Sequence, residues 1–267
     1  MPGIEAMKEK TMDPKKVARA FGVWFLLTWV FAIAGRELLS PAYSDPGYIL
    51  GAGSDVGVQL GAVFDFLLII ANIATAVVLY PIAKRHSQIG ALGYVAARIM
   101  ESAFIMVGVL SVVSMTALRQ DASGLTGAEV AALEATGRSL ATVYEFAFLF
   151  GPGLVVGFGN GLILGWLMYS SGLVPRRLAM LGLIGGPSLI VVFVLVLFGV
   201  VETGSAGQFV LSLPEMVWEA ALPIYAIWKG FRPSAITSDE PRQVGWTPPS
   251  QPRLRKGRNL PLNALDN

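Results

Sequence analysis

Cysteine is absent from this sequence, histidine occurs once, and charged residues are scarce. Without cysteine the chain forms no disulfide, no thiolate metal site and no cysteine nucleophile, and His86 alone does not build a histidine cluster. Only 14% of the residues are Asp, Glu, Lys or Arg, against about 25% in soluble domains. The composition therefore excludes an ordinary soluble domain.

In place of charge the sequence has long apolar runs, and 54% of its residues are hydrophobic. A helix needs about 20 mainly apolar residues to cross a bilayer. Six such spans are predicted, at residues 19–36, 59–83, 90–117, 143–170, 178–201 and 208–229. The predicted fold class is all-α: a polytopic transmembrane helical bundle of one domain, residues 19–231.

The segments on either side of this domain differ from it in composition. Residues 1–18 are basic, and the run that follows lacks a small-residue cleavage site, so we expect a retained first span rather than a removed signal peptide. Residues 232–267 are rich in proline and basic side chains. We predict a disordered tail there, with a weak attraction for anionic lipid headgroups.

The positions of the basic residues predict the orientation of the bundle. If both tails are cytoplasmic, 16 of the 20 Lys and Arg residues lie in the tails and cytoplasmic loops. Arg36, Arg119 and Arg138 lie outside, and Arg98 lies within the membrane. Cytoplasmic loops of membrane proteins carry an excess of Lys and Arg. We therefore expect a protein of the bacterial plasma membrane with both termini in the cytoplasm.

Glycine recurs every fourth residue in the fourth predicted span. The four positions, which fall on one helical stripe, are Gly153, Gly157, Gly161 and Gly165. Small residues at this spacing let a second helix approach closely inside a membrane. The sequence predicts a helix-packing stripe. Its partner is either another helix of this chain or a helix of a second chain, in a homo-oligomer or in a complex with another membrane protein.

Ionisable and amide side chains also occur near the middle of the predicted spans. At about 1.5 Å per residue, they lie roughly 12 to 18 Å from the cytoplasmic helix ends. They are Arg98, Glu101, Glu219, Asn72 and Asn160. Because a single charge facing lipid costs at least about 2.5 kcal/mol, we expect a central polar layer that faces inward, with Arg98 paired to Glu219 and Glu101 on the same face as Arg98.

Further carboxylates in the spans allow two interpretations of this layer. Glu215 precedes Glu219 by one turn, and Asp65 lies in the outer half of the second span. Together with Glu219 and Glu101 they would form an acidic path open to a proton or a cationic solute. The alternative is a buried ion-pair network that only sets helix register, since such networks also occur in purely structural roles.

Three stretches resemble a known family: YVAARIMESA at 94–103, LVPRRLAMLGLIGGP at 173–187 and LPEMVWEAALPIYAIWKGFRPS at 213–234. They are similar to the DUF4386 family of bacterial integral membrane proteins. The most specific part is the last-span pattern of Pro214, Glu215, Trp218, Glu219, Lys229, Gly230 and Phe231. The resemblance implies a fold and a location but no reaction, and it brings no catalytic residues. The tail after Arg232 lies outside the family pattern.

Three function classes follow. A binding, sensory or assembly protein needs only the bundle and its polar layer, and this non-enzymatic class is favoured. A proton- or cation-coupled carrier of small solutes would use Glu219, Glu101 and Arg98, although no inverted repeat is evident. An intramembrane enzyme is disfavoured, because no HExxH, GxSxG or P-loop motif occurs. We expect no cofactor and no metal site, the lipid bilayer as partner, and no nucleic acid.

Overall fold

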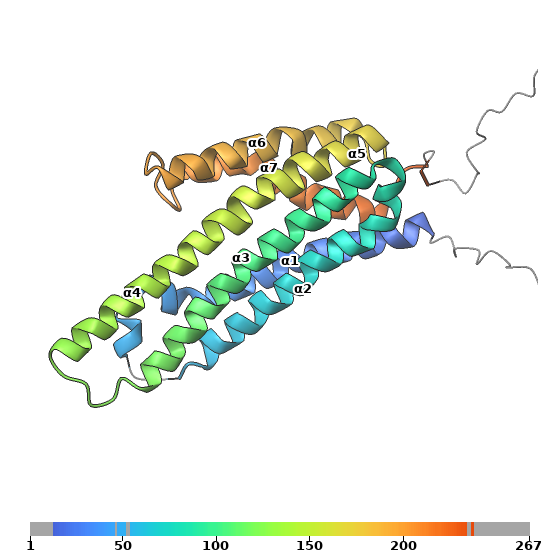
Figure 1. The fold of residues 1–267 in the computed structure, drawn as a ribbon. Helices are drawn as coiled ribbons and strands as arrows, with labels where there is room; N and C mark the ends of the chain where they lie inside the picture. Colours follow the sequence, from blue (N-terminus) through green and yellow to red (C-terminus); the bar gives the residue numbers. More distant parts are fainter. Residues whose placement is uncertain (1–12, 46, 52–53, 234–235, 238–267) are drawn as a thin grey trace, which may run out of the picture.

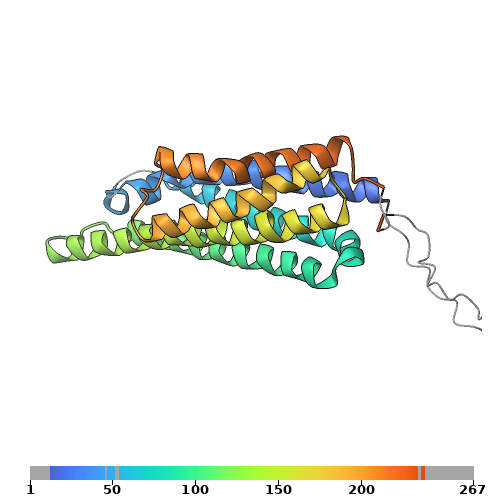
Figure 2. The same cartoon turned by 90° about the horizontal axis from the view of Figure 1, so that it is seen from above.

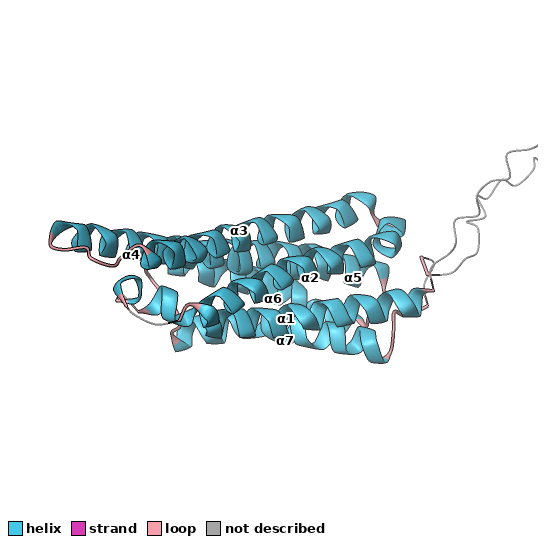
Figure 3. Ribbon diagram, turned by 90° about the horizontal axis from the view of Figure 1, so that it is seen from below, coloured by secondary structure: helices cyan, strands magenta, loops and turns pink. Residues whose placement is uncertain are grey.

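The computed structural model describes residues 13–45, 47–51, 54–233 and 236–237. Within this part of the chain there are helices and connecting loops but no strand (Figure 3). Six of the helices are long and apolar enough to cross a membrane. The predicted all-α bundle of six spans is confirmed, and the protein is a multi-pass membrane protein. Most of the tail predicted to be disordered, residues 232–267, lies outside the described residues.

The membrane-crossing helices are α1 (Pro14–Ser44), α2 (Val56–His86), α3 (Gln88–Gln120), the compound helix Ala128–Ser171, α6 (Arg176–Leu197) and α7 (Ala206–Trp228). The compound helix consists of α4 (Ala128–Phe148), the π-helical segments η2 (Leu149–Val155) and η3 (Gly157–Leu164), and α5 (Gly165–Ser171). A short 3₁₀ helix, η1 (Tyr48–Leu50), lies in the loop between α1 and α2.

Several helices are longer than the predicted spans, because hydropathy marks the apolar run and not the last helical hydrogen bond. α1 begins at Pro14, five residues before the predicted span, and the side chain of Asp13 caps it by accepting a hydrogen bond from the Lys15 amide at 2.9 Å. α4 begins at Ala128 rather than at 143. Polar first turns therefore extend the helices beyond the apolar part of the chain.

Successive long helices run in opposite directions, so Pro14 and Trp228 lie at the same end of the bundle (Figure 1). We call this the terminal end, and we call the opposite end, which holds Ser44, Gln120 and Leu197, the far end. α2 packs between α1 and α3, while α6 and α7 form a hairpin that contacts the compound helix and α1. α4 extends beyond this hairpin at the far end (Figure 2).

At the far end, Arg119 fastens the loop between α1 and α2 to α3. Its guanidinium donates to the Gly51 carbonyl at 2.9 Å and to the Asp55 carboxylate, and it lies 4.5 Å from the centre of the Tyr48 ring. The Tyr48 hydroxyl also donates to Asp55, at 2.9 Å. Burial, followed by this hydrogen bond, raises the pKa of Tyr48 above its ordinary value. Tyr48 therefore remains a protonated donor at neutral pH.

The glycine stripe of the compound helix lies against α6 of the same chain. A methyl group on Gly157 would approach Ile190 to 2.7 Å and the Gly186 carbonyl to 2.9 Å, and one on Gly161 would overlap the Gly186 backbone. Gly153 faces Phe193, and Gly165 faces Leu183. Gly157, Gly161 and Gly165 allow backbone to approach backbone, so along this stripe the compound helix packs closely on α6 of the same chain.

We expect Gly161→Ala to lower the free energy of unfolding by about 1–3 kcal/mol, because its new methyl group meets backbone that has no space to move. Gly93→Ala is the matched control: its methyl group would lie 3.6 Å from the Ile163 side chain, an ordinary contact. Unfolding of the purified protein by heat or denaturant measures both. Equal stability of the two variants would contradict the close contact.

Candidate functional site

Arg98 lies at the centre of a buried hydrogen-bonded layer that joins α2, α3 and η3. The residue is only 2% exposed. Its Nη1 donates to Glu101 Oε2 at 2.7 Å and its Nη2 to Asn72 Oδ1 at 2.8 Å. Its Nε donates to the Thr75 hydroxyl at 3.2 Å, and its Cζ lies over the Phe25 ring, 5.5 Å from the ring centre. These four side chains and Asn160 of η3 therefore fix the position of this cation.

The sequence predicted an ion pair between Arg98 and Glu219, and this prediction is wrong. Arg98 pairs instead with Glu101 on its own helix. Residues three apart on a helix share a face, so Glu101 reaches the guanidinium without any partner helix. The second oxygen of Glu101 accepts a hydrogen bond from Asn72 Nδ2 at 3.0 Å. Both carboxylate oxygens are thus occupied, and the pair is internally neutral.

Asn160 connects this pair to α7. Its Oδ1 accepts from Arg98 Nη1 at 3.2 Å, and its Nδ2 donates to Glu219 Oε1. Its backbone carbonyl accepts from the indole nitrogen of Trp218 at 3.0 Å. Because η3 contacts both α3 and α7, an amide takes the place where a direct contact between Arg98 and Glu219 was expected. Five of the predicted residues, namely Asn72, Arg98, Glu101, Asn160 and Glu219, therefore meet in one network.

Glu215 and Asp65 lie outside this network. Glu215 is 1% exposed and is packed against Gly161 and Gly185, and neither of its carboxylate oxygens has a hydrogen-bond partner among the described residues. Asp65 is fully buried beside Gly35, and its carboxylate likewise has no hydrogen-bond partner in the part of the chain that the structure describes. The four carboxylates of the expected acidic path are therefore not one connected chain: two are in the layer, and two are buried separately in helix contacts.

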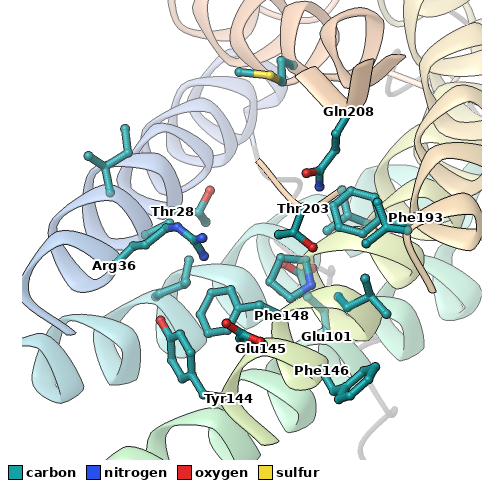
Figure 4. Close-up of a pocket in the computed structure, with 18 of the residues that line it drawn as sticks. Thr28, Arg36, Glu101, Tyr144, Glu145, Phe146, Phe148, Phe193, Thr203 and Gln208 are labelled. Carbon is teal, nitrogen blue, oxygen red and sulfur yellow. The ribbon is translucent and has the colours of Figure 1, made fainter. Parts of the chain in front are cut away.

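A cavity of about 660 Å³ lies on the far-end side of the layer, between α1, the compound helix and the α6–α7 hairpin. Thr28 and Arg36 of α1 line one side of it, and Phe193 of α6 lies across from them (Figure 4). Asn72, Arg98, Glu101 and Glu219 also line the cavity. The polar layer thus forms the floor of the cavity. A solute in the cavity can contact the side chains of the hydrogen-bonded network there.

Most of the cavity wall was not predicted from the sequence. The additional lining residues are mainly aromatic and aliphatic, with polar side chains toward the far end; they include Trp29, Tyr43, Tyr144, Glu145, Phe146, Phe148, Thr203, Gln208 and Met216. These residues come from helices far apart in the sequence, and each resembles an ordinary apolar or interfacial residue of a span. Only the buried Arg98, Asn72 and the carboxylates gave a signal in the sequence that pointed to this region.

The site has the composition of a binding cavity. Volumes of about 300–1,000 Å³, apolar walls and a few convergent polar groups are typical of small-molecule sites. Within the described residues, no three His, Asp or Glu side chains gather closely enough to hold a metal ion. The cavity therefore combines apolar contact with one charged, hydrogen-bonding floor.

If the pair of Arg98 and Glu101 holds the layer together, Arg98→Ala should destabilise the protein by about 3–5 kcal/mol, because it leaves a buried carboxylate without its cation. Adding Glu101→Ala should restore part of the loss, since no orphan charge then remains. Thermal unfolding of the two single variants and the double variant measures the coupling. Strict additivity of the two losses would exclude a direct energetic interaction.

A family model described as "Domain of unknown function (DUF4386)" matches residues 20–230. Neither the curated proteins nor the solved structures returned a match. The matched range includes most of α1, the other five spans in full and every residue of the polar layer. Because it covers well over half of the chain, the protein belongs to the DUF4386 family.

Proposed function

We propose that this protein is a non-enzymatic binding protein, for sensing or for presentation to a partner, that takes up a small amphipathic molecule in the bacterial plasma membrane. The observation that carries the proposal is the cavity of about 660 Å³ that ends on the layer of Arg98, Glu101 and Glu219. A protein whose buried charges serve only helix register has no need to leave such a volume beside them, because interiors are otherwise close-packed.

The distribution of basic residues supports an orientation with both termini in the cytoplasm. Lys84 and Arg85 in the last turn of α2 and Arg176 and Arg177 at the start of α6 are at the terminal end, together with the start of α1. In this orientation the cavity lies in the outer half of the membrane. Its ligand would enter from the outer leaflet or from the extracytoplasmic space.

The shape of the cavity supports a ligand with one polar end. Leu68, Val156 and Phe193 belong to its apolar wall, whereas the floor presents charged and amide groups. An amphipathic molecule would bury its apolar part against the wall and place its polar group on the floor. Burial of apolar surface contributes about 25 cal/mol per Å², and the polar group supplies specificity.

A coupled carrier is the second candidate, and one observation favours it. Glu219 lines the cavity, and its carboxylate has Asn160 as hydrogen-bond partner but no ion-pair partner among the described residues. A membrane-embedded carboxylate of this kind is typical of proton and cation pathways. The carrier proposal is tested by flux in proteoliposomes: Glu219→Gln should abolish a pH-dependent uptake, and unchanged uptake would exclude Glu219 as the coupling group.

The binding proposal predicts that filling the cavity abolishes ligand-induced stabilisation. Met216 lines the cavity one turn before Glu219, whereas the next residue, Val217, is 44% exposed on the outside of α7. Met216→Trp is therefore the test variant and Val217→Trp its matched control. We expect compounds from a library of membrane-soluble metabolites and drugs to raise the melting temperature of wild type and Val217→Trp but not of Met216→Trp. If no compound separates the two variants, the cavity is not a binding site.

A further inference from the structure

We infer that the ligand is a lipophilic organic cation, and that its positive centre lies against Glu219 on the cavity floor. This inference rests on the proposed binding function and adds the chemical class of the ligand. Three features of the site carry it: the charges of the floor, the accessible oxygen of Glu219, and the aromatic side chains of the wall.

The charges around the cavity are unequal. Its ionisable lining residues are two guanidiniums, Arg36 and Arg98, and three carboxylates, Glu101, Glu145 and Glu219. Arg98 and Glu101 neutralise one another at 2.7 Å. Arg36 and Glu145 are both exposed, toward the far end. Glu219 is therefore the remaining floor charge, and a cationic ligand would provide the counter-charge that the described residues do not.

The environment of Glu219 leaves one of its oxygens available. Asn160 Nδ2 donates to Oε1 and thereby sets the orientation of the carboxylate. Oε2 accepts no hydrogen bond from the described residues. It is nevertheless not fully buried, whereas both oxygens of Glu215 are fully buried and have no partner among those residues. Since Glu219 lines the cavity, a solute can contact this oxygen without displacing any side chain.

On the floor, an anionic ligand would find only Arg98, a cation that is already paired with Glu101. Both Arg98 Nη1 hydrogens and the Nε hydrogen already serve Glu101, Asn160 and the side chain of Thr75, and Nη2 also donates to Asn72 Oδ1. An anion would therefore have to compete with a buried ion pair, and removal of one partner of such a pair costs several kcal/mol. The floor is complementary to positive charge.

The wall adds a second feature suited to a cation. Six of the lining residues are aromatic: Trp29, Tyr43, Tyr144, Phe146, Phe148 and Phe193. Aromatic faces attract organic cations, and cages of aromatic rings are a common way to bind quaternary ammonium groups. Figure 4 shows Tyr144, Phe148 and Phe193 in the wall around the cavity. The same rings provide the apolar surface that a lipophilic body needs.

The test compares two probes of nearly the same shape and opposite charge, tetraphenylphosphonium and tetraphenylborate. Binding to purified protein in nanodiscs is measured by equilibrium dialysis and by the shift in melting temperature. Wild type should bind the phosphonium at least about tenfold more tightly than the borate, and Glu219→Gln should lose at least about tenfold in phosphonium affinity, because a desolvated charge partner has been removed. Met216→Trp should bind neither probe, and Val217→Trp should behave as wild type.

Glutamine is nearly isosteric with glutamate, and its side-chain carbonyl keeps the acceptor for Asn160. If Glu219→Gln nevertheless fails to fold, the preference of wild type between the two probes decides the question alone. Equal binding of the two probes, preference for the borate, or absence of phosphonium binding would each overturn the cation inference. If wild type binds the borate and Met216→Trp does not, the proposed binding function stands, but the inference that the ligand is a cation is wrong.

Discussion

A guanidinium buried among transmembrane helices is the constraint on which this bundle depends. Arg98 is only 2% exposed, and an arginine side chain does not lose its charge in a protein. Placed in hydrocarbon without partners, it would cost several kcal/mol. Three of the helical segments around it supply acceptors: α3 supplies Glu101, α2 supplies Asn72 and Thr75, and η3 supplies Asn160. The register of these helices follows from that requirement.

Close packing on the side of the compound helix that faces α6 makes this helix register possible. Gly157 and Gly161 bring α6 into backbone contact, and Asn160, their neighbour in sequence, is directed toward α3 and α7 instead. The π-helical geometry of η2 and η3 occurs where Pro152 removes a backbone donor and glycine is abundant. π-helical turns are frequently found at functional sites, and here one of them holds the amide that links the ion pair to Glu219.

The cavity is a consequence of where the helices separate. α1 and α7 touch near Gly22 and Pro223 at the terminal end, whereas the far-end parts of α1, the compound helix and the α6–α7 hairpin enclose the cavity. The polar layer stands at this transition. The layer lies between the closely packed terminal end of the bundle and the cavity, and it forms the cavity floor. The groups that stabilise the fold are therefore also those that a ligand would contact.

The sequence by itself determined the six-helix membrane fold and the identity of the buried polar residues, because apolar length and the cost of isolated charge are local properties of the chain. Asn72, Asn160 and Glu101 were identified in this way. Only the tertiary structure decided that Arg98 pairs with Glu101, that Asn160 stands between Arg98 and Glu219, that Glu215 faces α6, and that a cavity lies beside the layer. Helix depth can be counted along one segment, but the direction in which a side chain points depends on how several helices are rotated and packed together.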